Sequence, residues 1–251
     1  MKLATTTLIG IVALSPVVAK AQYTVTVDAD NDYALYTGNG TAATVFYGNQ
    51  YNSLSSQLRV AQSYNVTLNA ANDYIYIAAW GDLSGAQGLL ADISSSISGN
   101  LLLPSGSIGA GQWQVAATGM LLPASAPPPD VYFTDPGLAN AIAAANNATD
   151  PSGGWVTPID YTTYDNAQGG VYTDIYGSPG IVVPQISPAS EWMWYLIPGT
   201  GGGDAPFYPD VNENEYLLFR MPATAVPEPA SAGLIMASGI GVLGMRRRKT
   251  A

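Results

Sequence analysis

Apolar and polar residues alternate along many short stretches of this chain, and an alternation with a period of two is typical of β-strands that bury one face. Tyr23–Asp28 alternates in this way, whereas Tyr74–Trp80 is apolar or aromatic almost throughout, as in a strand at the centre of a sheet. The stretches with strand character are 23–28, 33–36, 44–47, 64–68, 74–80, 89–93, 113–116, 192–197 and 215–220. Because turns rich in Gly and Asn separate several of them, the pattern predicts an all-β fold, either a β-sandwich or a jelly roll.

One segment in the second half of the chain has helical character instead. Asp135 is of a helix-capping type and Pro136 suits the first helical position, and an Ala-rich run follows until two Asn residues that can end a helix. We therefore predict a short helix at 136–146. Pro-rich and Gly-rich loops flank it, so residues 123–185 are predicted to form a long, loop-rich insertion within one extracellular domain, 22–225.

The N-terminus has the pattern of a secretory signal peptide, which we assign to residues 1–21. A Lys near the start precedes an apolar run, and Ala19 and Ala21 provide the small residues expected around a cleavage site before Gln22. We expect the secretion machinery to export the chain and a peptidase to remove this segment.

The C-terminus carries a second apolar segment, at 230–245. Its sixteen residues contain no charge and would span about 24 Å as a helix, which is short beside the roughly 20 residues of a stable membrane span. Four basic residues follow, and they would stay on the cytoplasmic side. These are Arg246, Arg247, Arg248 and Lys249. We predict a short transmembrane helix that transiently holds the chain in the inner membrane, with the preceding domain outside.

A Pro-Glu-Pro motif stands directly before this apolar run. It consists of Val226, Pro227, Glu228, Pro229 and Ala230. The order of motif, apolar helix and Arg-rich end over 226–251 resembles the PEP-CTERM sorting signal. The resemblance implies export by a bacterium with an outer membrane and cleavage near the motif by an exosortase, a membrane transpeptidase, followed by delivery to the cell surface or the extracellular space. It also implies an association with exopolysaccharide or biofilm matrix, which many proteins of that family accompany.

The composition excludes several classes of function. The chain has no Cys and no His, which rules out disulfides, thiolate chemistry, His-dependent catalytic triads and zinc sites built on these residues. Between Gln22 and Val226 stand 17 acidic and two basic residues, a net charge of −15, so repulsion from phosphate argues against nucleic acid as a partner.

Three acidic residues near the start of the domain form a candidate metal site. Asp28, Asp30 and Asp32 stand at a spacing of two, so on a continuous strand their carboxylates would project to one side. A hard cation such as Ca²⁺ would relieve their mutual repulsion. A solvated acidic turn is the alternative.

The same region carries a second resemblance. An Asp-rich turn leads into a strand at 27–36, and a later strand at 72–80 ends in Trp, which resembles galactose-binding-like jelly-roll domains over about residues 22–118. This resemblance implies a fold more than a sugar specificity.

Together these patterns predict an exported protein that is not an enzyme, with a structural or adhesive role and an association with polysaccharide through exposed aromatic rings. The first alternative is a carbohydrate-active enzyme, since paired carboxylates are sufficient for glycoside hydrolysis, although the sequence marks no pair. The second is a simple membrane-anchored protein of unknown ligand, with a Pro-rich stalk in place of a sorting signal.

Overall fold

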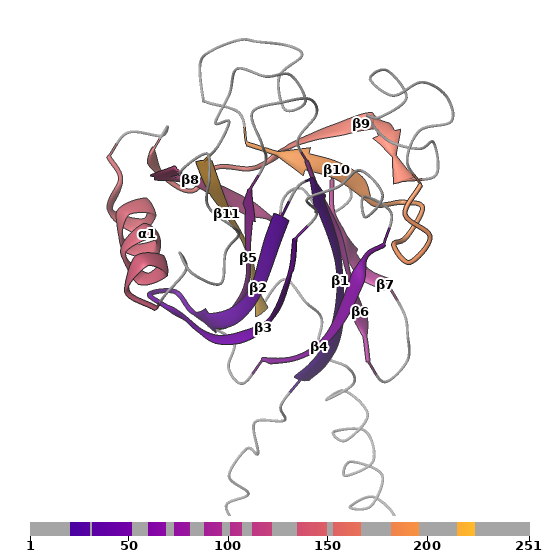
Figure 1. Ribbon diagram of the computed structural model, residues 1–251, viewed down its shortest axis with the longest axis horizontal. Helices are drawn as coiled ribbons and strands as arrows, with labels where there is room; N and C mark the ends of the chain where they lie inside the picture. Colours follow the sequence, from indigo (N-terminus) through magenta and orange to yellow (C-terminus); the bar gives the residue numbers. More distant parts are fainter. Residues whose placement is uncertain are drawn as a thin grey trace, which may run out of the picture.

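The protein consists mostly of β-strands arranged in two antiparallel sheets, with one helix in the described part of the chain (Figure 1). The structure is a computed structural model, and it describes residues 21–30, 32–51, 60–68, 73–80, 88–96, 101–106, 112–121, 135–149, 153–166, 182–195 and 215–223.

Sheet A has the strand order β4-β1-β6-β10-β9, and β7 pairs with β6 outside this path. Its strands are β1 (Ala21–Asp30), β4 (Gln62–Leu68), β6 (Gly88–Ser95), β7 (Leu101–Pro104), β9 (Ile159–Asp165) and β10 (Glu191–Trp194). Sheet B has the order β3-β2-β5-β11-β8. Its strands are β2 (Asp32–Asn39), β3 (Ala43–Tyr51), β5 (Asp73–Trp80), β8 (Gln114–Leu121) and β11 (Glu215–Pro222).

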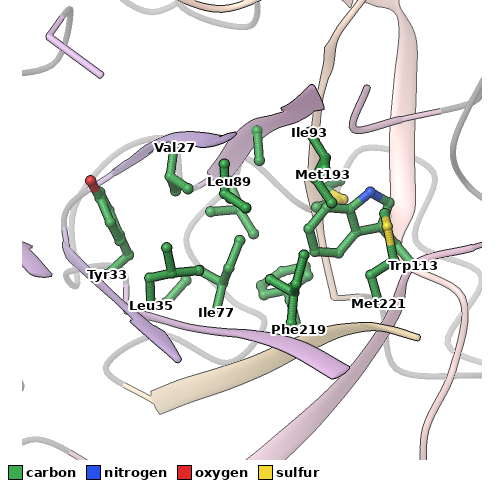
Figure 2. Close-up of a cluster of buried hydrophobic side chains, with 14 of the residues drawn as sticks. Val27, Tyr33, Leu35, Ile77, Leu89, Ile93, Trp113, Met193, Phe219 and Met221 are labelled. Atoms are coloured by element: carbon green, nitrogen blue, oxygen red, sulfur yellow. The ribbon is translucent and has the colours of Figure 1, made fainter. Parts of the chain in front are cut away.

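The main core lies between the two sheets. Alternate residues of each strand point into it, as the period of two requires. Figure 2 shows Val27 and Leu89 of sheet A across from Leu35, Ile77 and Phe219 of sheet B, and all five are fully buried. Each such side chain contributes about 1.5–3 kcal/mol by leaving water. The prediction of a mostly β, two-sheet fold is therefore confirmed.

A second apolar cluster lies on the outer face of sheet B, beneath the helix. Helix α1 (Asp135–Asn147) extends one residue beyond the predicted range at each end. Leu138 and Ile142 are one turn apart, so they share one face of the helix. Both pack on Tyr36, Tyr76 and neighbouring apolar residues of sheet B.

The outer face of sheet A is contacted by residues 182–190, a segment that begins inside the predicted insertion, 123–185, and continues beyond it. The buried side chain of Asn166 fixes it, since its amide nitrogen donates to the carbonyl oxygens of Val183 and Ile186 at 2.9 and 2.8 Å, and its oxygen accepts from the Val183 N–H at 2.8 Å. The Ser187 N–H donates to Asp92 Oδ2 of β6 at 2.7 Å. Together with β9, these contacts show that part of the range predicted as loop-rich belongs to the sandwich.

The turn of the β2–β3 hairpin is held by a side chain and by a close approach of the backbone. Asn39 closes it, because its side-chain oxygen accepts from Thr41 and Ala42 N–H groups at 2.9 and 3.1 Å. Gly38 is needed for close approach, since a Cβ there would meet the Ala42 carbonyl oxygen at 2.0 Å. Among the glycines that the structure describes, positive φ occurs at Gly106 and Gly119 instead.

Candidate functional site

The predicted acidic turn is where the chain passes from one sheet to the other. Asp28 and Asp30 lie at the end of β1 in sheet A, and Asp32 opens β2 in sheet B. Val27 and Tyr33 point into the core, so by alternation Asp28 and Asp32 point to the outer faces of different sheets. The strand does not continue through all three positions, as the prediction assumed.

Asp28 and Asp32 are both fully buried, and the side chain of Asp30 is not among those described. Within the described residues, no group of three or more acidic, His or Cys side chains is placed to hold a metal ion. The Ca²⁺ site that includes Asp30 stays a prediction.

The outer face of sheet B contains a cluster that the sequence analysis did not identify, which we call the Arg220 cluster. Its members come from β5, β8, α1, the loop after α1, and β11. They are Tyr74, Tyr76, Gln114, Asn146, Trp155 and Arg220. Arg220 is the one Lys or Arg residue within the described ranges, and it is 8% exposed.

Aromatic rings and amides surround the guanidinium group. It stacks on Trp155 at 3.6 Å from the ring centroid and lies 4.8 Å from the centroid of Tyr74. Its Nε donates to Gln114 Oε1 at 2.8 Å and its Nη1 to Asn146 Oδ1 at 3.2 Å. Cation–π contacts of this kind contribute about 0.5–2 kcal/mol each. The cluster therefore ties α1 and the Trp155 loop to sheet B.

Burial shifts the titration of this cluster. It lowers the pKa of Arg220, although the neighbouring Tyr76 and Tyr74 oppose the shift. It also raises the pKa of Tyr76 to about 12, against the effect of the Arg220 charge. Tyr76 therefore remains a neutral phenol at physiological pH, and its hydroxyl donates to the Asn39 carbonyl oxygen at 2.7 Å.

A row of residues that pair in register across all five strands of sheet B passes through Arg220. Strand register places Phe46, Tyr36, Tyr76, Arg220 and Gln114 side by side on β3, β2, β5, β11 and β8. Five adjacent strands make the row about 19 Å long. Its middle lies under α1, whereas Phe46 at one end is 53% exposed.

The accessible aromatic rings gather on this face. Most large rings of the described chain are fully buried, including Trp192 and Trp194. Tyr74 and Trp155 are half-buried beside Arg220. Tyr36 contacts Phe46 at 5.3 Å between centroids, and Tyr76 contacts Trp155 at 6.5 Å. The outer face of sheet B is thus the best-supported surface for stacking on a ligand ring.

The carboxyl groups in the structure bear on the enzyme alternative. Burial raises the pKa of Asp92 and of Glu215, and in each case a hydrogen bond from a backbone N–H, Ser187 or Gly119, opposes the shift. These two residues belong to different sheets.

A different pair lies on adjacent strands. Glu191 of β10 stands opposite Asp165 of β9, where Cβ atoms are about 5 Å apart. Glu191 is buried against Gly106 and is fixed through its backbone, since its N–H donates to the Ser105 carbonyl oxygen and its carbonyl oxygen accepts from Ser105 Oγ. The sequence alone could not bring these two acids together.

The two predicted sorting segments lie outside the described residues, apart from Ala21 at the end of the signal peptide. The N-terminal segment comprises the signal-peptide residues before Ala21. The C-terminal segment comprises the motif at 226–230, the apolar run at 230–245 and the basic cluster at 246–249. No helix in the described ranges is long and apolar enough to cross a membrane.

No protein-family model matches the chain, and neither a curated protein nor a solved structure with significant similarity to it was found.

Proposed function

We propose that this chain is an exported bacterial surface or matrix protein that is sorted through its C-terminal Pro-Glu-Pro signal and has a structural or adhesive role. The observation that carries the proposal is the order of motif, apolar run and basic cluster at 226–251. The transient partners would be the secretion machinery and an exosortase.

The position of the strands is compatible with processing at both ends. The first described strand begins at Ala21 and the last ends at Pro222. Cleavage before Gln22 would remove one residue of β1, and cleavage near Pro227 would remove none of β11. The sandwich can therefore persist as a mature domain after both segments are lost.

We further propose that the mature domain associates with polysaccharide through the outer face of sheet B. Aromatic side chains with hydrogen-bonding groups nearby are suited to binding sugars, because the apolar face of a sugar ring can stack on the aromatic ring while the sugar hydroxyls bond the polar groups. Phe46, Tyr74 and Trp155 provide the accessible rings, and Asn39 and Asn146 lie exposed at the same end of the sheet, with their side-chain oxygens bonded within the protein.

Mass spectrometry of the protein from its natural host tests the sorting proposal. The mature protein should end close to Pro227–Ala230, and a Glu228→Ala variant should accumulate with its tail intact. Recovery of the intact wild-type tail from cells with a functional exosortase would contradict the proposal and favour the simple membrane anchor.

Binding to the host exopolysaccharide tests the adhesive role. Phe46→Ser should weaken binding roughly two- to tenfold, which corresponds to about 0.5–1.5 kcal/mol for one lost ring contact. Val182→Ser is the matched control, because it also removes an exposed apolar side chain (44% exposed) but from the segment 182–190. Equal effects of the two substitutions would count against the sheet B face.

One observation favours a carbohydrate-active enzyme as a second candidate, namely the position of Glu191 opposite Asp165. Retaining glycosidases hold their two carboxyl groups about 5–5.5 Å apart, a separation that two side chains on adjacent strands can reach. Turnover of a glycoside that both Glu191→Gln and Asp165→Asn abolish, while Asp73→Asn does not, would establish this function instead.

The finer jelly-roll connectivity of galactose-binding-like domains also stays a prediction.

A further inference from the structure

The chain enters and leaves the sandwich at the same end. Ala21, at the start of β1, pairs with Leu68 in sheet A, and Pro222, at the end of β11, pairs with Tyr74 in sheet B. Leu68 and Tyr74 are only six positions apart, which spans at most about 20 Å. We call this the entry end, and the opposite end, where Asp32 pairs with Trp80, the far end.

Other elements confirm this orientation. Asn39, at the β2–β3 turn, pairs with Asp73 and therefore also lies at the entry end. The side chain of Asn146, near the end of α1, donates to the Gly40 carbonyl oxygen of the same turn at 2.7 Å. In Figure 1 this hairpin turn and the lower end of α1 lie side by side at the lower part of the sandwich.

The chain between the sandwich and the predicted apolar run is short. Seven positions separate Ala223 from Ala230, and they reach at most about 24 Å when fully extended. The ten residues of β1 alone are about 33 Å long. A sandwich held by this segment can therefore bring its entry end to the bilayer surface more easily than its far end.

The acidic residues of the described strands are distributed unevenly between the two ends. By strand register, those toward the far end are Asp28, Asp30, Asp32, Asp160 and Glu215. Those near the middle are Asp92, Asp165 and Glu191. Among the acids in described strands, Asp73 alone lies at the entry end, and Arg220 is two residues from Pro222 in the same half. Asp28 and Asp32 are fully buried and Glu215 is 9% exposed, so this distribution adds little surface charge, and the orientation follows from the short connection at the entry end.

From these observations we infer that, while the apolar run holds the chain, the sandwich stands end-on, with its entry end against the lipid surface and its far end directed away from it. This inference rests on the proposed membrane-held form. It adds an orientation, which presents the far end to the surroundings and leaves the Pro-Glu-Pro motif between the domain and the bilayer.

Energy transfer to lipid headgroups tests this orientation. The absence of Cys allows single dyes to be attached at Thr41→Cys in the entry-end turn, at Asn65→Cys in the middle of β4, and at Gln62→Cys near the far end; all three positions are exposed. The chain with an intact tail, purified from cells that lack exosortase, would be reconstituted into vesicles with anionic lipid and an acceptor dye on the headgroups.

We expect transfer to be greatest at Thr41, intermediate at Asn65 and least at Gln62. Equal or reversed transfer in a chain that floats with the vesicles would overturn the orientation while leaving the membrane-held form intact. A chain that does not float with the vesicles would overturn the membrane-held form, and the orientation with it.

Discussion

Asp92 is a carboxyl group that holds the segment 182–190 on sheet A although burial opposes its charge. It is 6% exposed, and it accepts hydrogen bonds from the Ser187 N–H and the Thr26 hydroxyl. Burial outweighs these bonds and raises the pKa of Asp92 above its ordinary value. The folded state therefore binds this proton more tightly than the unfolded state, so the contribution of Asp92 to stability falls as pH rises from about 4.

Asp92→Asn should remove this pH dependence while keeping the acceptor for Ser187. We expect the melting temperature of the variant to equal or exceed that of the wild type at pH 7, and the difference to decrease or reverse at pH 4. Asp92→Ala is the control: it loses the acceptor and should be less stable at both pH values, by about 1–3 kcal/mol. A wild type whose advantage over Asp92→Asn grows with pH would contradict this account.

At the scale of elements, the sequence pattern identified every strand of the described chain except β7 and β9. Edge position is not the cause, because the edge strands β3, β4 and β8 were identified. β7 is only four residues long and reads Leu-Leu-Leu-Pro, without alternation, and β9 reads Ile-Asp-Tyr-Thr-Thr-Tyr-Asp, with little apolar character. Local pattern identifies a strand only where apolar and polar residues alternate or an apolar run is long enough.

The candidate site was less predictable than the strands. The Arg220 cluster joins residues from positions 74 to 220 through tertiary contacts, so no local spacing marks it. The one available signal was a single Arg inside an otherwise apolar strand, Tyr216–Met221. The acidic turn was read as one strand because alternation alone does not show that the chain changes sheets between Asp30 and Asp32.

Strands β3 and β4 come together where the two sheets meet at one edge, and Gly48 makes this possible. The ring of Tyr64 lies over Gly48, where a Cβ would meet its Cε1 at 2.4 Å. The Tyr64 hydroxyl also lies 3.2 Å from that of Tyr33, and the two rings meet edge to face. A side chain at position 48 must therefore displace this pair.

Gly48→Ala should destabilise the protein by about 1–3 kcal/mol, the usual range for overpacking. Gly40→Ala provides the control, because a Cβ there would meet only the Tyr74 ring at an ordinary 3.7 Å. Thermal denaturation of both variants checks this expectation. Equal stability of the two variants would mean that β3 and β4 can separate at little cost.

At the scale of the whole molecule, the excess of acidic residues means that Ca²⁺ could stabilise the protein in two ways, by binding at one site or by screening charge in general. Substitutions at different acidic positions distinguish the two. If Asp30 takes part in a Ca²⁺ site with its neighbours, millimolar Ca²⁺ should raise the melting temperature by linkage, with about 2.7 kcal/mol of added stability at a hundredfold excess over Kd. The effect should be lost in Asp30→Asn and kept in Asp73→Asn, which removes the same charge at the entry end. An equal shift in both variants would indicate general charge screening.

The two neighbours of β5 lie at very different distances along the chain. Ile77 pairs with Leu35 on one side and with Phe219 on the other, separations of 42 and 142 positions by residue number. Contacts of large sequence separation form slowly, because a long loop must close before they contribute. During export from the N-terminus, β5 can pair with β2 early, while its other edge stays open to pairing with other chains until β11 arrives. The predicted apolar run begins only eight positions after β11 ends at Pro222, so sheet B can be completed only when nearly the whole exported part of the chain has crossed the membrane.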